Sequence, residues 1–163
     1  MDTITELRRE IERTLVPYAL SRGFVVDRKQ APDFLNFRRC SLDKVEMFDI
    51  QWDKNGRPRF TVNFGSCPPG GLSIRGTHYA AEEVSAGWHG VSHGRLQPTT
   101  GLKQSWFGQD DPQLEGQLAD ARLHTPGELV GLLLDLLREV ETYWTSGTVG
   151  PHLRMMPRRP KDH

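Results

Sequence analysis

The chain has 163 residues, the length of one ordinary domain, and its 21 basic residues balance its 21 acidic residues. This neutral charge argues against nucleic acid as a partner, because proteins that bind phosphate backbones usually carry a basic excess. No run approaches the ~18 apolar residues of a membrane span, and no signal-peptide pattern opens the chain, so we expect a cytoplasmic protein without membrane contact.

The first element expected is an amphipathic helix over residues 4–21. Thr3 and Glu6 have the spacing of a capping box, and apolar side chains then recur at three- and four-residue steps. Pro17 is expected to kink or restart the helix, and Gly23 to end it in a left-handed turn.

Strands are expected next, and the clearest of them form a hairpin. The runs 46–52 and 60–64 alternate apolar and polar residues, the period of a half-buried strand, around a turn that contains Asn-Gly. Shorter apolar runs predict further strands at 24–26 and 34–38.

Residues 65–108 show no clear period, and their many glycines indicate irregular backbone. We expect a short helical turn at 80–84 and further strands at 88–96 and 103–107. Long irregular segments in compact domains are often functional, so a site is first sought in this stretch.

Helical order returns towards the end of the chain. A short helix is expected over 110–121, and the capping box at 125–128 starts a long apolar-striped helix over 126–145. The remainder, 148–163, is expected to be a disordered and mildly basic tail, so that residues 1–147 form the single domain.

Together these elements predict an α+β fold. Its antiparallel sheet has about four to six strands, with the N-terminal and C-terminal amphipathic helices packed on one face. Cys40 and Cys67 are expected to be reduced thiols. Charge and composition leave the oligomeric state undetermined, and a homodimer is expected only because such dimers are common.

No catalytic, metal-binding or cofactor-binding signature is present in the sequence. His89 and His93 are four residues apart, which suits a metal on a helix, but the glycines around them disfavour a helix. Cys67 with one of these histidines would form a nucleophile and its base, yet a buried thiol at a sheet edge is far commoner. We therefore expect no catalytic residue, no metal ligand and no cofactor.

Aromatic and basic residues of the irregular stretch suggest a surface for a partner or a ligand. The candidates are Trp88, His89, His93, Arg95 and Trp106, because Trp and Arg dominate interface hot spots. The leading hypothesis is a non-enzymatic protein that binds a protein partner, for example a toxin-immunity module.

The alternative hypothesis is a small-ligand-binding protein or a hydrolase with a polar pocket on the sheet. Gln51 and Asn63 are the polar residues expected to line that pocket, together with the two histidines. The basic residues of the nearby strands are expected to form a solvated strand face: Arg38, Arg39 and Lys44.

Several short motifs follow one another in a characteristic order. They are Gly23-Phe24, Phe37-Arg38, Ile50-Gln51-Trp52, Asn63-Phe64-Gly65, Arg95-Leu96 and Trp106-Phe107. In this order they resemble the bacterial family called domain of unknown function 4304, over about residues 4–145. The stretch 68–88 and the phenylalanine at 107, where the family has a second tryptophan, depart from its pattern. The resemblance implies a bacterial protein and a fold, but no activity.

Overall fold

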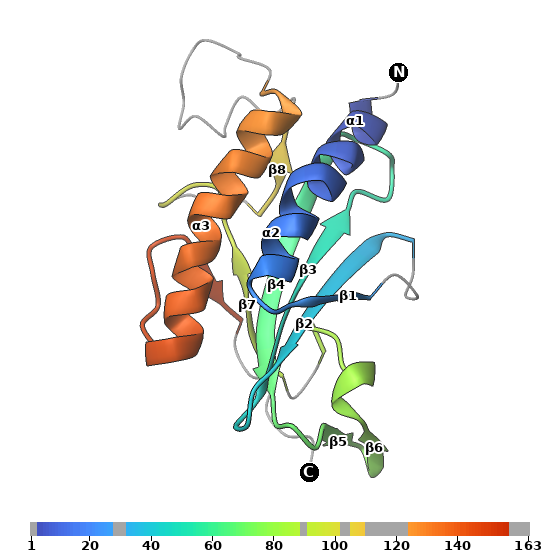
Figure 1. The fold of residues 1–163 in the computed structure, drawn as a ribbon, viewed down its shortest axis with the longest axis vertical. Coiled ribbons are helices and arrows are strands. Elements are labelled where there is room, and N and C mark those ends of the chain that lie inside the picture. The colour runs from blue at the N-terminus through green and yellow to red at the C-terminus, as the bar shows by residue number, and fades with distance from the viewer. Residues whose placement is uncertain (1–2, 28–31, 89–90, 102–104, 110–123, 157–163) are drawn as a thin grey trace.

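A seven-stranded antiparallel sheet with helices on one of its faces forms the body of the chain (Figure 1). The computed structural model describes residues 3–27, 32–88, 91–101, 105–109 and 124–156. The α+β class and the two helical segments are confirmed, although the sheet has more strands than the four to six that the sequence predicts.

The sheet is built around the predicted hairpin. Its strands are β1 (Val25–Asp27), β2 (Phe34–Cys40), β3 (Val45–Trp52), β4 (Arg59–Cys67), β7 (Ser92–Leu96), β8 (Phe107–Gly108) and β9 (Leu153–Met155). They lie in the order β1-β2-β3-β4-β7-β9, and β8 also pairs with β4. The hairpin strands β3 and β4 therefore occupy the centre of the sheet.

The N-terminal helix is interrupted where the sequence predicts it, directly before Pro17. It consists of α1 (Thr3–Glu10), the π-helical turn η1 (Ile11–Leu15) and α2 (Val16–Ser21). The Val16 N–H donates to the Ile11 carbonyl, five residues back, so this turn is wider than an α-helical one. In a regular helix the proline ring clashes with the carbonyl four residues back, and the wider turn relieves that clash.

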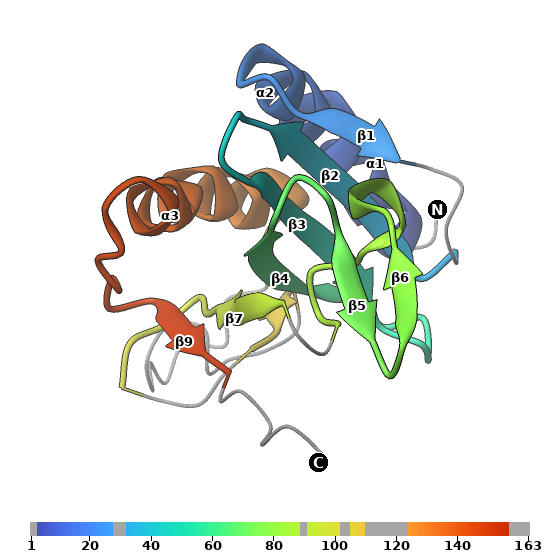
Figure 2. The same cartoon turned by 90° about the horizontal axis from the view of Figure 1, so that it is seen from below.

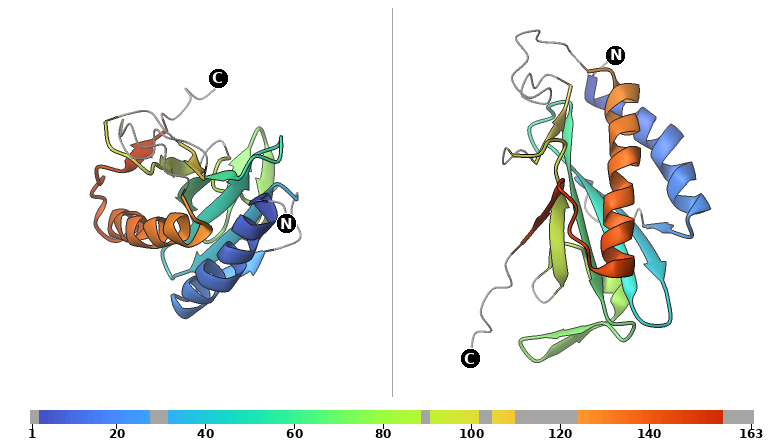
Figure 3. Two further views of the ribbon diagram at one scale, coloured as in Figure 1. Left: turned by 90° about the horizontal axis from the view of Figure 1, so that it is seen from above. Right: turned by 90° about the vertical axis from the view of Figure 1, so that its left-hand side faces the viewer.

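The C-terminal helix α3 (Pro126–Ser146) begins and ends close to the predicted residues. Thr125 Oγ1 accepts a hydrogen bond from the Glu128 N–H at 3.1 Å, as a capping residue does. Gly147 ends the helix with φ +77°, and its N–H donates to the Tyr143 carbonyl at 2.8 Å. Figure 3 shows α3 on the same side of the sheet as α1 and α2.

The main core lies between the helices and the sheet. Phe37 and Phe48 stack there with ring centroids 4.5 Å apart, and Leu133 of α3 is fully buried. Burying a side chain of this size contributes about 1.5–3 kcal/mol, so this layer holds the helices on the sheet.

A smaller unit covers one end of the opposite face of the sheet (Figure 2). It consists of β5 (Leu72–Ile74), β6 (Thr77–Tyr79) and the 3₁₀ turn η2 (Ala81–Glu83). Apolar side chains on and after η2 pack against apolar side chains of β3 and β4 in a second cluster: Val45, Met47, Cys67, Ala81, Val84, Ala86 and Val91. The turn at 80–84 is confirmed, whereas the β5–β6 hairpin carries no periodic signal and was not predicted.

The prediction of a disordered tail from residue 148 is wrong for residues 148–156. There β9 pairs with β7, whose backbone groups would otherwise lack partners on that side. The His152 Nδ1 lies 2.5 Å from Glu139 Oε2, which ties the segment to α3. The short helix expected over 110–121 lies wholly outside the described residues, as do residues 157–163 of the tail.

Candidate functional site

The sheet face opposite the helices carries one polar side chain from each of six strands in a cross-strand row. The row runs Asp27, Asn36, Asp49, Asn63, Arg95 and Arg154, each paired in register with the next. It arises because successive side chains of a strand point to opposite faces. On β3, Phe48 and Ile50 belong to the helix-side core, so Asp49 and Gln51 point the other way.

Asn63 joins the middle of this polar row through three hydrogen bonds. Its Nδ2 donates to Asp49 Oδ1 at 2.8 Å and to Gln51 Oε1 at 3.2 Å. Its Oδ1 accepts from Arg95 Nε at 3.1 Å. Thr61 Oγ1 also donates to the Gln51 oxygen, at 3.4 Å. Both amide hydrogens of Asn63 are thus used within the protein, which fixes the positions of its neighbours.

Gln51 and Arg95 keep hydrogen-bond donors that the network does not use. Within the described ranges, no partner bonds the Gln51 Nε2 or the Nη atoms of Arg95. Both side chains are half-buried, whereas Asn63 between them is buried. A bound molecule would therefore meet an amide donor and a guanidinium donor on either side of a fixed asparagine.

Asp49 is the acidic residue of the network and is deeply buried, with 2% of its surface exposed. Burial raises the pKa of its carboxyl from 3.8 to about 7, although the hydrogen bond from Asn63 and the charges of Arg95 and Arg38 oppose the rise. Near pH 7 the group is therefore divided between acid and carboxylate, and it either donates or accepts a hydrogen bond. Acids with such strongly perturbed pKa values concentrate at functional sites.

Arg38 lies on the same face, two residues along β2 from Asn36, and is 9% exposed. Its Nη1 donates to the Ala81 carbonyl at 2.9 Å and to the Val84 carbonyl, which ties η2 to the sheet. Its Nε and Nη2 are buried without a partner. The predicted solvated strand face is therefore wrong for Arg38, because η2 covers this end of the sheet.

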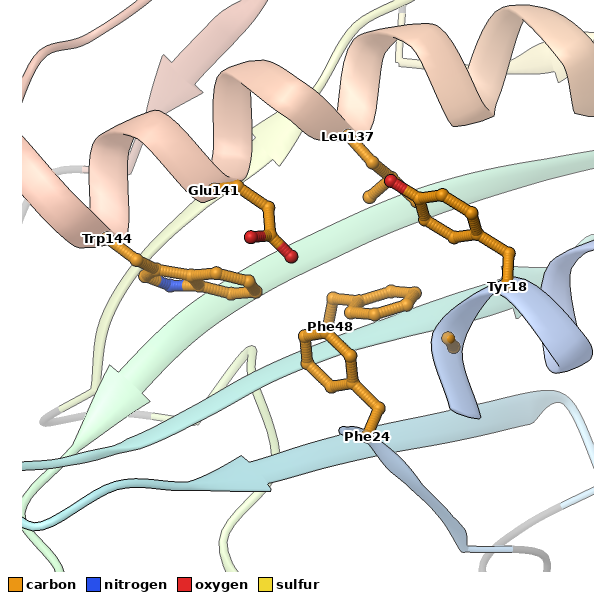
Figure 4. Close-up of a pocket in the computed structure, with 7 residues that line it drawn as sticks. Tyr18, Phe24, Phe48, Leu137, Glu141 and Trp144 are labelled. Carbon is orange, nitrogen blue, oxygen red and sulfur yellow. The ribbon is translucent and has the colours of Figure 1, made fainter. Parts of the chain in front are cut away.

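The helix side of the sheet offers a different environment, a narrow gap between α2 and α3 (Figure 4). Its lining is mostly apolar: Tyr18, Ala19, Phe24, Phe48, Leu137, Glu141 and Trp144. Glu141 pairs with Arg39 Nη1 at 3.1 Å, and the Arg39 guanidinium lies 4.4 Å from the Phe24 ring centroid. Lys44 Nζ donates to the Trp144 carbonyl. Arg39 and Lys44 thus hold α3 on the sheet, so the predicted solvated face is wrong for them too.

Of the residues selected from the sequence, the structure brings together Gln51, Asn63 and Arg95. His93 lies on the same face of β7, two residues from Arg95, and its Nδ1 is 3.0 Å from the Val91 carbonyl. His89 lies outside the described residues.

The two candidate tryptophans do not share a surface. Trp88 packs edge-on against Tyr79, with ring centroids 5.1 Å apart, in the cluster around Cys67 at one end of β4. Trp106 packs under the Arg59 guanidinium, 4.1 Å from its ring centroid, at the other end. A strand rises about 3.3 Å per residue, so the length of β4 separates the two rings.

Asp49 and Arg38 are the site residues that the sequence reasoning missed. A signal existed for Asp49, because it occupies a polar position of an alternating strand and pairs with Asn63 across the predicted hairpin. No local signal existed for Arg38, because its burial depends on a segment 43 residues further along the chain.

Cys67 is buried in the apolar cluster under η2, where burial raises the pKa of its thiol. A thiol that resists ionisation is a poor nucleophile, which leaves this residue a packing role. Over the described ranges, no three His, Cys, Asp or Glu side chains are grouped in a way that would hold a metal ion. In those same ranges, no helix combines the length and the apolar character that crossing a membrane requires.

The chain was compared with known protein families, curated proteins and solved structures. No protein-family model, curated protein or solved structure matches the chain. The resemblance to the bacterial family named above stays a prediction.

Proposed function

We propose that this protein binds a small polar molecule on the sheet face that carries Asp49, Gln51, Asn63 and Arg95. The observation that carries the proposal is the burial of Asp49 within the hydrogen-bonded row. With a pKa of about 7 in place of 3.8, its ionised form costs the folded protein about 4 kcal/mol. A neutral side chain at this position would avoid that cost. Residues that lower the stability of the folded protein are typically kept at functional sites.

The free donors beside Asp49 indicate what the molecule offers. Gln51 Nε2 and the Nη atoms of Arg95 require acceptor oxygens or nitrogens, and Asp49 matches either a donor or an acceptor according to its protonation. Asn63 holds all three side chains in place before any ligand arrives. Such preorganisation lowers the entropy that binding costs.

The two competing hypotheses have less support from the geometry. A protein partner was expected at Trp88 and Trp106, but these rings pack against their own neighbours at opposite ends of β4. A hydrolase was expected to line its pocket with Gln51, Asn63 and the two histidines, but His93 bonds the Val91 carbonyl and His89 lies outside the described residues. Both hypotheses, and the expected homodimer, stay predictions.

A cytoplasmic location belongs to the same proposal. Cys40 and Cys67 are both free thiols, which suits a reducing compartment.

The test is a thermal-shift screen of small metabolites carrying carbonyl, amide, carboxylate or phosphate groups. We expect at least one compound to raise the Tm of the wild-type protein in proportion to its concentration. The variant Arg95→Met should weaken that binding at least tenfold, since hydrogen bonds to charged groups contribute about 1.5–3 kcal/mol.

The matched control is Arg57→Met, which removes the same group from the exposed turn between β3 and β4. It should bind the compound as the wild-type protein does. The proposal fails if no compound binds, or if every compound that binds does so equally well to Arg95→Met once circular dichroism shows that variant to be folded.

A further inference from the structure

The guanidinium of Arg38 presents two unused donors on one edge. Its Nη1 is occupied by the carbonyls of Ala81 and Val84, whereas Nε and Nη2 are buried without a partner. Nε and Nη2 carry parallel N–H bonds that form the side-on fork of an arginine. A fork of this geometry matches the two oxygens of a carboxylate or a phosphate.

The contact of Arg38 with η2 does not explain why Nε and Nη2 are left without partners. That contact uses Nη1 alone, and the single ammonium group of a lysine would make it as well. Buried polar groups are nearly always hydrogen-bonded, so two orphaned donors on one edge of one side chain call for a partner.

The surroundings of Arg38 place the fork on the proposed binding face. It lies on the same side of the sheet as Asp49, whose carboxyl its charge influences. Its cross-strand neighbour is Val25 of the edge strand β1, which is 67% exposed, so Arg38 lies one strand in from an exposed edge of the sheet.

We infer that the Arg38 fork receives an oxyanion, a carboxylate or phosphate group, of the molecule bound on the polar face. This inference rests on the proposed function and adds the class of ligand to it. Arg95 Nη and Gln51 Nε2 then bind acceptors at the other end of the same molecule. Asp27 and Glu82 lie near enough to act on Arg38 through space, and Arg38 forms no ion pair with a described residue. These two acids oppose the entry of an anion, so an isolated oxyanion should bind only at about millimolar concentration.

The experiment titrates the full chain with inorganic phosphate and, separately, with acetate, and follows the ¹⁵N signals of the arginine Nε groups. We expect the Arg38 Nε signal to shift saturably with at least one of the two anions, and the better anion identifies the source of the oxyanion. Arg38→Lys keeps the charge but loses the fork, and it should weaken binding at least tenfold. The matched variant Arg57→Lys should leave binding unchanged.

The results separate this inference from the proposed function. If neutral compounds bind at Gln51 and Arg95 while neither anion moves the Arg38 signal, the inference is overturned and the proposed function stands. An affinity for anions that survives Arg38→Lys in a folded protein also overturns the inference. If anions bind at Arg38 but no compound reaches Gln51 or Arg95, the proposed function fails instead.

Discussion

Replacing Asp49 by asparagine should stabilise the protein at neutral and alkaline pH. The amide has the shape of the carboxyl and keeps an oxygen that accepts the hydrogen bond from Asn63 Nδ2. In the wild-type protein, burial raises the pKa of Asp49 from 3.8 to about 7. The folded state therefore keeps its proton to higher pH than the unfolded chain does. The contribution of Asp49 to the stability of the wild-type protein therefore falls as the pH rises from about 4 to about 7.

The size of this effect follows from the two pKa values. One pKa unit corresponds to 1.36 kcal/mol, so a rise from 3.8 to about 7 amounts to about 4 kcal/mol at pH 8. We expect Asp49→Asn and the wild-type protein to differ little at pH 4. At pH 8 the variant should be the more stable by about 4 kcal/mol.

Urea unfolding at pH 4, 6 and 8 measures the free energy of unfolding of each protein. The control Asp135→Asn removes an exposed carboxyl from α3 and should leave the pH dependence of the wild type unchanged. If the stability gained by Asp49→Asn is the same at all three pH values, or if the variant is destabilised at pH 8, the burial argument for Asp49 is refuted.

Two further pairs of variants test the fold that positions the site. Arg39→Met should lower the free energy of unfolding by about 2 kcal/mol because it loses ion pairs to two glutamates, whereas Arg138→Met on the exposed side of α3 should change it by under about 0.5 kcal/mol. Equal effects of these two arginines would contradict the anchoring role. Gly94→Ala should cost about 2 kcal/mol, since a Cβ there would lie 2.7 Å from a β9 carbonyl oxygen, whereas Gly131→Ala in open space on α3 should add about 1 kcal/mol. Urea unfolding measures all four, and a stabilised Gly94→Ala would contradict the close packing of β7 against β9.

Local patterns were enough to predict the elements that hold the site. The alternation on either side of the Asn-Gly turn gives β3 and β4, and the capping box at Thr125 gives the start of α3. These patterns involve only residues that are close in sequence, so they can be recognised before the fold is known. Because β3 and β4 pair across one turn, the hairpin also places Gln51 and Asn63 on one face.

The features that the sequence did not reveal depend on distant partners. β9 has three residues and β8 has two, too few to show a period, and each pairs with a strand more than 40 residues away. Arg38 was expected to face solvent because the second face of the sheet was assumed to be open. Its burial follows from η2, whose packing on β3 and β4 is a tertiary contact.

The most direct test of the central claim is a map of where small molecules bind. The protein, labelled with ¹⁵N, is titrated with a fragment library of amides, carboxylates and phosphates, and the side-chain signals of Gln51, Asn63 and Arg95 are followed. We expect the saturable shifts to converge on these three side chains. Shifts that instead converge on Trp144 and the helix-side gap, or no saturable shifts at all, would contradict the proposed function.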